Sequence, residues 1–110
     1  MPIMTPLNVE NCSRMLTTRS GLAVVYFSAS WCQPCKDMKP VFLQLAEAHP
    51  GDEVSFGTVD VAESPTLAQT YGVRAVPAIV VFRQGRLAAV ISGQVPLEVV
   101  TQRVRHALFA

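Results

Sequence analysis

The strongest chemical feature of this 110-residue chain is a pair of cysteines with two residues between them. The pair lies in the segment 31–36, which reads W-C-Q-P-C-K, where an apolar run at 22–27 gives way to a helical pattern. Two cysteines at this spacing can close a small disulfide across the first turn of a helix. The unpaired amides and positive end of that helix favour an anion, so we expect a stabilised thiolate at Cys32, and the thiolate is the nucleophile.

Three neighbours of the pair could adjust this chemistry. Pro34 fits the first turn of a helix and removes one possible N–H donor to the thiolate. Trp31 offers an apolar wall that limits water around the sulfurs, and Lys36 could support the thiolate by its charge. The alternative interpretations are an inert cysteine pair, two metal ligands and, for Lys36, a solvated surface lysine. A C-x-x-C pair at a strand-to-helix junction favours redox chemistry.

The other potential metal ligands and thiols are scattered along the chain. A four-ligand zinc site would need the distant His49 and His106 or the single Cys12, so we expect no metal. Three cysteines are also too few for a disulfide framework. Cys12 shares helical spacing with Val9 and Leu16, which predicts a buried and unreactive side chain more than a regulatory thiol.

The elements that must position the cysteines follow from hydrophobic periodicity. The unbroken apolar run 22–27 is typical of a strand covered on both faces. Met38, Val41 and Leu45 recur at helical spacing and indicate an amphipathic helix from about Pro34 to His49. Alternation of strands and helices followed by a hairpin and a helix predicts an α/β sandwich with a mixed sheet. The remaining predicted elements are a helix capped by Asn8, a strand at 54–59, a short helix between Ser64-Pro65 and Gly72, strands at 78–82 and 87–91 joined by a tight turn, and a helix from Pro96.

Composition and length exclude several classes of protein. At roughly 150 residues per domain, the length predicts one domain over residues 1–110. Nine basic and eight acidic residues leave no basic field for a nucleic-acid partner. The longest apolar run has six residues, against roughly 18 for a bilayer span, so we expect no membrane segment. The first residues show no signal-peptide pattern, which favours a cytoplasmic location.

The chain resembles the thioredoxin family over almost its whole length. The shared features are the order of the predicted elements, the W-C-x-P-C motif, Pro40 inside the following helix, the Val76-Pro77 dipeptide and Gly93 after the last strand. The resemblance implies the thioredoxin fold, a three-layer sandwich in which helices flank a central mixed sheet. It also implies that Val76-Pro77 is a cis-proline loop whose backbone pairs with an extended partner segment, and that Gly93 allows the partner's backbone to approach.

The same resemblance implies a thiol–disulfide oxidoreductase that reduces disulfides in protein substrates. Cys32 corresponds to the attacking thiol and Cys35 to the resolving thiol, which releases the reduced substrate from a mixed disulfide. From its place at the start of the helix Cys32 is expected to be exposed, and Cys35, one turn in and facing the core, is expected to be shielded. The cycle needs no bound cofactor, and its electrons come from a partner such as a thioredoxin reductase; we expect a monomer. The substrate-binding surface that the resemblance implies is made of Trp31, Gln33, Pro34, Val76, Pro77 and Gly93.

Two other functions stay open from the sequence. One is an exported domain that serves a dedicated redox pathway such as cytochrome maturation. The other is a binding or holdase module with weak redox activity, which grips unfolded segments with the apolar rim of Trp31, Val76 and Pro77.

The sequence also departs from the family pattern at four positions. Thioredoxins commonly have a buried acid six residues before the first active cysteine, and a lysine paired with it. Tyr26 and Phe56 stand at those two positions, Gln33 replaces a usual glycine, and Ala78 replaces a common threonine. A tyrosine with a pKa of about 10 is a poor general base at neutral pH. We therefore expect Tyr26, together with Lys36, to modulate the thiol pKa and the rate of exchange.

Overall fold

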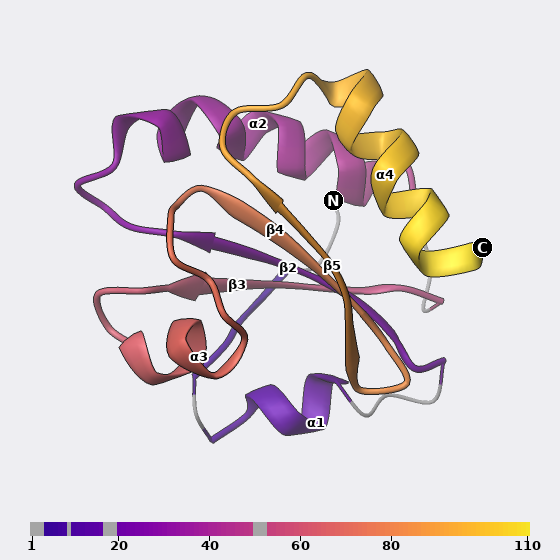
Figure 1. The fold of residues 1–110 in the computed structure, drawn as a ribbon, viewed down its shortest axis with the longest axis horizontal. Helices are drawn as coiled ribbons and strands as arrows, with labels where there is room; N and C mark the ends of the chain where they lie inside the picture. Colours follow the sequence, from indigo (N-terminus) through magenta and orange to yellow (C-terminus); the bar gives the residue numbers. More distant parts are fainter. Residues whose placement is uncertain (1–3, 9, 17–19, 50–52) are drawn as a thin grey trace.

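The computed structural model describes residues 4–8, 10–16, 20–49 and 53–110. Within these ranges five strands form one sheet in the order β1-β3-β2-β4-β5 (Figure 1). Strands β1, β3 and β2 are parallel, whereas β4 is antiparallel to both β2 and β5, so the sheet is mixed as predicted. The elements are β1 (Met4–Pro6), α1 (Cys12–Leu16), β2 (Leu22–Ser28), α2 (Gln33–Glu47), β3 (Ser55–Asp60), α3 (Pro65–Thr70), β4 (Ala78–Arg83), β5 (Arg86–Ser92) and α4 (Leu97–Phe109).

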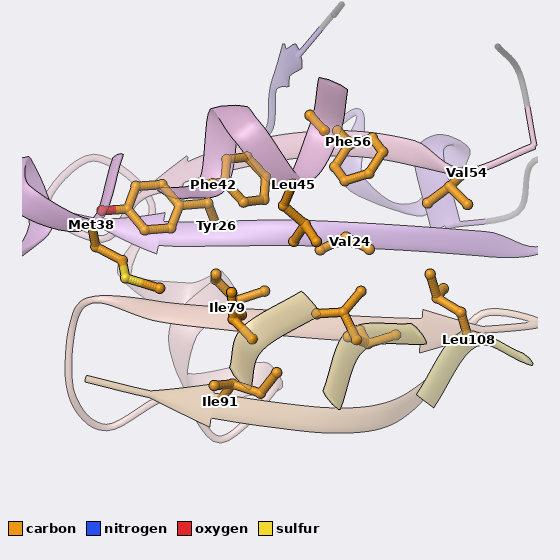
Figure 2. Packing of buried hydrophobic residues seen from close by; sticks show 14 residues of the cluster. Val24, Tyr26, Met38, Phe42, Leu45, Val54, Phe56, Ile79, Ile91 and Leu108 are labelled. Carbon is orange, nitrogen blue, oxygen red and sulfur yellow. The ribbon is translucent and has the colours of Figure 1, made fainter. Parts of the chain in front are cut away.

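Helices cover both faces of the sheet, which gives the three predicted layers (Figure 1). Strand β2 lies between β3 and β4, and its residues point alternately to the two faces. Val24 and Tyr26 pack in the layer of α2 and α4, a cluster shown in Figure 2. Val25 and Phe27 pack in the opposite layer, together with residues of α1 and α3. The prediction of a strand buried on both faces is confirmed.

Helix α2 carries its apolar stripe as the periodicity predicted. Met38, Phe42 and Leu45 are buried against the sheet, and Pro40 lies on the exposed side of the helix. The helix ends at Glu47, two residues before the predicted end at His49. Because α2 begins immediately after β2 and a short turn, its first turn lies at the carboxyl end of the central strand. This end of the sheet is where the two cysteines lie.

The last two strands form the predicted hairpin. Gln84 and Gly85 both have positive φ, 53° and 76°, which are the values of a two-residue type I′ turn. Glycine at the second position of this turn avoids the steric cost that a side chain would meet there. In β4 every residue before Arg83 is buried, and Arg83 itself is exposed. Strand β5 lies at the edge of the sheet and leaves Leu87 and Val90 exposed.

The structure adds one strand that the sequence did not predict. Residues of β1 pair in parallel with 56–58 of β3, and β1 forms the other edge of the sheet. After β1, the Asn8 side chain accepts hydrogen bonds from the amides of Glu10 and Asn11, at 2.9 and 3.0 Å, and leads the chain into α1. Val9, which was expected on the apolar face of α1, lies outside the described residues. Among the described helices, none has the length and apolar character needed to cross a membrane.

Candidate active site

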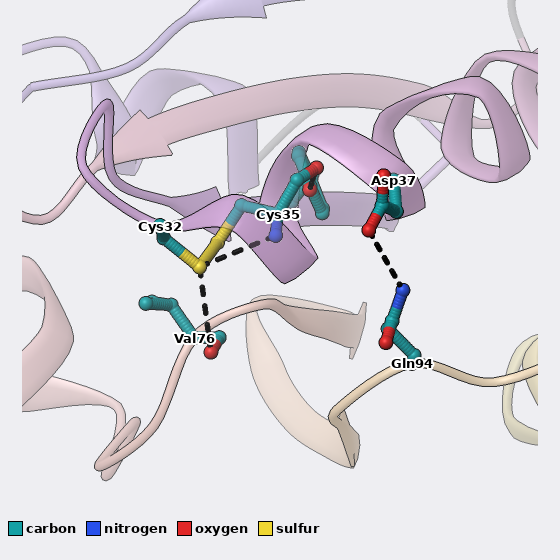
Figure 3. Close-up of a disulfide and its surroundings, with 6 residues drawn as sticks. Cys32, Cys35, Asp37, Val76 and Gln94 are labelled. Atoms are coloured by element: carbon teal, nitrogen blue, oxygen red, sulfur yellow. Dashed lines mark hydrogen bonds between the residues drawn. A yellow bond between two sulfur atoms is a disulfide. The ribbon is translucent and has the colours of Figure 1, made fainter.

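Cys32 and Cys35 form a disulfide across the first turn of α2, as the spacing predicted (Figure 3). Cys32 is the N-cap residue, with an extended backbone (φ −95°, ψ 109°), and its Sγ accepts a hydrogen bond from the amide of Cys35 at 3.2 Å. That amide is one of the donors that the start of a helix leaves unpaired. Pro34 follows at the start of the helix, where its missing N–H costs no intrahelical bond. The local sequence therefore places the sulfur of Cys32 at the positive end of α2.

The two cysteines are almost equally shielded in the disulfide. Cys32 is 5% exposed and Cys35 3%, so the prediction that Cys32 is exposed is wrong for this state. Ala29, Val61 and Val76 pack around the pair. Trp31 is 72% exposed, so most of its ring faces solvent. The apolar shield expected from Trp31 is thus provided mainly by the small and branched side chains that pack against the cysteines.

The segment around Val76 and Pro77 lies directly against the disulfide. The Val76–Pro77 peptide bond is cis, as the family resemblance implied. The Val76 carbonyl oxygen is 3.8 Å from Cys32 Sγ, a position that a thiol at Cys32 could use as a hydrogen-bond acceptor. The Pro77 side chain is buried, and its carbonyl accepts a hydrogen bond from the amide of Gly93 at 2.8 Å. This bond brings the loop after β5 beside the cysteines.

The other residues expected to contact a substrate lie around the disulfide on the surface. Gln33 and Pro34 are exposed on the first turn of α2, and Trp31 precedes them. Gly93 has a φ of 83°, which strains any residue with a side chain. A Cβ added at Gly93 would meet no atom within 4 Å, so the space in front of this glycine is open. The structure thus brings together all six residues of the expected surface, although the side chain of Pro77 is buried.

Tyr26 lies beneath the first turn of α2. It stands at the sequence position where thioredoxins commonly have a buried acid. Its hydroxyl donates to the backbone carbonyl of Cys35 at 2.5 Å, and its ring stacks on Phe42 with centroids 5.1 Å apart. Burial raises the pKa of Tyr26 to about 12, so the hydroxyl is protonated at neutral pH. Among the described residues no Asp or Glu is buried. At the position where thioredoxins commonly have a buried acid, the site therefore has a neutral hydroxyl that donates a hydrogen bond and cannot serve as a general base at neutral pH.

Phe56 completes this aromatic group. It is buried and meets Phe42 edge to face at 5.9 Å, so Phe42 packs between Tyr26 and Phe56 (Figure 2). Lys36, the other residue expected to influence the thiols, is exposed on α2. Its effect on the cysteines stays a prediction.

Sequence reasoning missed a polar pair beside the disulfide. The side-chain amide of Gln94, in the loop after β5, donates to a carboxylate oxygen of Asp37 at 3.4 Å (Figure 3). Asp37 follows the motif directly, but its partner is 57 residues away. No local sequence pattern predicts such a contact. The two segments are brought together only by the sheet and by the hydrogen bond between Gly93 and Pro77.

The third cysteine lies away from this site. Cys12 is buried between α1 and the sheet, with its Sγ 3.9 Å from the hydroxyl of Tyr71. Burial raises the pKa of the Cys12 thiol, which keeps it in the less reactive protonated form. Its predicted burial is confirmed. In the part of the chain that the structure describes, no three His, Cys, Asp or Glu residues are grouped to hold a metal ion.

A disulfide at the N-terminus of a helix, set on a mixed five-stranded sheet beside a cis-proline loop, defines a thiol–disulfide oxidoreductase with the thioredoxin fold. The thioredoxin family model matches residues 3–106. The chain belongs to the thioredoxin family.

Individual relatives agree with this assignment. The chain is 34% identical to a thioredoxin of Malassezia sympodialis over 94 residues, which covers 86% of this chain and 90% of the relative. It is 38% identical to a thioredoxin of Rhodospirillum rubrum, over 69% of this chain and 72% of the relative. The crystal structure of the Malassezia protein superposes with a TM-score of 0.83, at 30% identity, and covers 97% and 93% of the two chains. A mutant thioredoxin from Halobacterium salinarum gives a TM-score of 0.80 at 27% identity, with 96% and 93% covered.

Proposed function

We propose that this oxidoreductase acts as a protein-disulfide reductase, with Cys32 as the nucleophile and Cys35 as the resolving thiol. The observation that carries the proposal is the hydrogen bond of 3.2 Å from the amide of Cys35 to the sulfur of Cys32. In the reduced protein this amide and the positive end of α2 stabilise a thiolate at Cys32. Cys35 lies within the first turn of the helix, and because both cysteines are almost equally buried, their positions along the helix and not their exposure assign the two roles.

The proposed cycle transfers two electrons to the substrate. The Cys32 thiolate attacks one sulfur of a substrate disulfide, which forms a mixed disulfide and expels the first substrate thiolate. Cys35 then loses its proton and attacks the sulfur of Cys32. The Cys32–Cys35 disulfide forms, the second substrate thiolate leaves, and both substrate thiolates take up protons. A partner reductase returns two electrons to the protein and completes the cycle.

The substrate surface in this proposal is the exposed area around the disulfide. Trp31, Gln33 and Pro34 offer exposed side chains. The backbone of Val76 lies beside the Cys32 sulfur and can pair with an extended segment of the substrate. The open space in front of Gly93 leaves room for the substrate's main chain. Disulfide-containing proteins are therefore the proposed substrates, and a monomer with one such surface is the proposed working form.

The proposed reductase needs surroundings in which its own thiols are returned to the reduced state. We therefore propose a reducing compartment, the cytoplasm, and an electron donor of the thioredoxin reductase kind. Neither nucleic acid nor a lipid surface has a part in the proposed cycle.

The direct test is reduction of insulin disulfides with dithiothreitol as the electron source, which compares the wild type with Cys35→Ser and Cys12→Ala. The wild type and Cys12→Ala should both accelerate precipitation of the reduced insulin chains. Cys35→Ser should lose turnover, and when it is reduced beforehand, freed of dithiothreitol and mixed with insulin, it should accumulate a mixed disulfide through Cys32, visible by mass spectrometry. A mixed disulfide that forms through Cys35 when Cys32 is replaced, but not through Cys32 in Cys35→Ser, would reverse the two assigned roles.

A further inference from the structure

An open pocket of about 340 Å³ lies between α2 and the loop that joins β5 to α4. It is continuous with the proposed substrate surface, because Gly93, which bonds to Pro77 beside the disulfide, directly precedes the loop residues that line it. Its volume is at the lower end of the range found for small ligand pockets, about 300–1,000 Å³. The lining consists of Asp37, Met38, Val41, Gln94, Val95 and Pro96.

The lining is apolar at its base and acidic at its edge. Met38 is buried, and Val41 and Val95 are half-buried, so the base offers aliphatic and thioether surface. Asp37 is the only charged side chain of this lining, and it is exposed. Glu98 in the first turn of α4 is acidic too, but it is not among the residues that line the pocket. Among the described residues no lysine or arginine lines the pocket, although Lys36 and Lys39 lie on the exposed side of the same helix.

The polar contact at the edge is one that a ligand can readily replace. The Gln94 amide reaches Asp37 at 3.4 Å, a long and solvent-exposed hydrogen bond. A cation offers the carboxylate a stronger, charge-assisted bond than a neutral amide does. Side chains that combine an apolar stem with a cationic end are those of lysine and arginine, which commonly bury the stem and keep the charge at the surface.

We propose that this pocket is a substrate subsite that takes a lysine or arginine side chain from the segment flanking the attacked disulfide. The stem packs on Met38, Val41 and Val95, and the cationic group pairs with Asp37 in place of the Gln94 amide. The proposal rests on the proposed function, because the side chain must belong to a chain held beside Cys32. It adds a charge preference that the disulfide itself does not provide.

Single-turnover reduction of synthetic peptides tests the subsite. Each peptide has one cysteine in a mixed disulfide with a coloured thiol, and one of the three positions on either side carries lysine, norleucine or glutamate. Norleucine keeps the lysine stem without its charge. At one or two positions, lysine should react about two- to fivefold faster than norleucine, the range expected for one exposed ion pair, and glutamate should react more slowly than norleucine. Added salt should reduce the preference.

Variants at two acidic positions of α2 identify the group responsible. Asp37→Asn should bring the lysine-to-norleucine ratio close to one, and Asp37→Lys should favour the glutamate peptide. Glu47→Gln changes the net charge equally at the far end of the helix, where Glu47 is exposed, and should keep the wild-type ratio. The ratio cancels any effect of Asp37 on thiol reactivity, since both peptides react with the same sulfur.

The outcomes separate the subsite from the function on which it rests. Equal rates for lysine and norleucine at every position, or a ratio that Asp37→Asn leaves unchanged, would overturn the subsite alone. Failure of the reduced wild type to react with any peptide through Cys32 would overturn the proposed function and the subsite together.

Discussion

Replacing Tyr26 by phenylalanine removes one oxygen atom and with it the hydrogen bond to the Cys35 carbonyl. The ring is retained, so its stacking on Phe42 at 5.1 Å can persist. A neutral hydrogen bond contributes about 0.5–1.5 kcal/mol net to stability. We therefore expect Tyr26→Phe to lower the free energy of unfolding by about 1 kcal/mol at pH 7.

The pH dependence of this difference follows from the pKa of Tyr26, which burial raises from 10.0 to about 12. Below pH 10 the hydroxyl is protonated in both folded and unfolded chains, and its contribution to stability is fully present. Above pH 10 it ionises first in the unfolded chain, so the wild type loses stability until the pH reaches the folded pKa. At about 1.36 kcal/mol per pKa unit, the loss is on the order of 2–3 kcal/mol. Tyr26→Phe has no such group and escapes this loss.

Urea unfolding of the oxidised proteins, from pH about 7 to about 12, measures both effects. The wild type should be more stable at neutral pH and the less stable of the two near the upper limit. Cys12 and Tyr71 titrate in both proteins, so the difference isolates Tyr26. The rate of insulin reduction at neutral pH should change by less than about twofold, because a protonated hydroxyl cannot accept the proton of Cys35. A stability difference independent of pH, or a tenfold loss of rate in a folded variant, would refute this account of Tyr26.

Three further variants have expected outcomes. Cys12→Ala should keep the insulin-reduction rate within about twofold. It should lower the free energy of unfolding, followed by thermal unfolding, by about 1 kcal/mol or more, as for other buried large-to-small changes. A collapse of activity at normal stability would contradict the unreactive role of Cys12. Gly93→Ala should cost about 1–2 kcal/mol because of its positive φ, measured by urea unfolding, and an unchanged stability would contradict that reason. Tyr26→Asp combined with Phe56→Lys should lower the melting temperature and speed insulin reduction near neutral pH. The gain in rate should be smaller at alkaline pH. An unchanged neutral rate in the folded variant would show that removal of the Cys35 proton does not limit the cycle.

Much of the fold could be predicted because its main elements have strong local signals. The run 22–27 contains only aliphatic and aromatic residues, a pattern typical of a strand covered on both faces, and β2 is buried on both sides. The stripe that includes Met38 and Leu45 has helical period and faces the sheet. Gly85 suits the positive φ of the second position in a type I′ turn, whereas Gln84 adopts a positive φ at the first position that its side chain does not favour. In each case the residues near one another in sequence decide the structure.

Strand β1 could not be predicted for the opposite reason. Its three residues include Pro6, which cannot donate to a ladder, and three residues are too few to show alternation. The strand exists because β3 offers an unpaired edge to 4–6 across about 50 residues of chain. Pairing of this kind depends on the assembled sheet and leaves no pattern in the segment itself.

The site divides in the same way. The motif around Cys32 and Cys35 and its place at a strand-to-helix junction indicated the disulfide and the helix terminus. The shielding of Cys32 depends on Val61 and Val76, which reach it from other segments. The contact between Asp37 and Gln94 likewise needs the loop after β5 to lie beside α2. Local chemistry was therefore predictable, whereas the packing around Cys32 and the contact between Asp37 and Gln94 were not.

At position 26 a hydrogen-bond donor replaces the proton acceptor that is common in the family. The Tyr26 hydroxyl is protonated at neutral pH and donates to the Cys35 carbonyl, so it cannot accept a proton there. That bond joins the central strand to the first turn of α2, the turn whose Cys35 amide bonds to the Cys32 sulfur. A neutral donor at this place avoids the desolvation cost of a buried carboxylate. In the proposed cycle the proton of Cys35 then passes to water or to the departing substrate thiolate, and we expect the exchange step to depend on the substrate's own sulfur more than it would with a base in the protein.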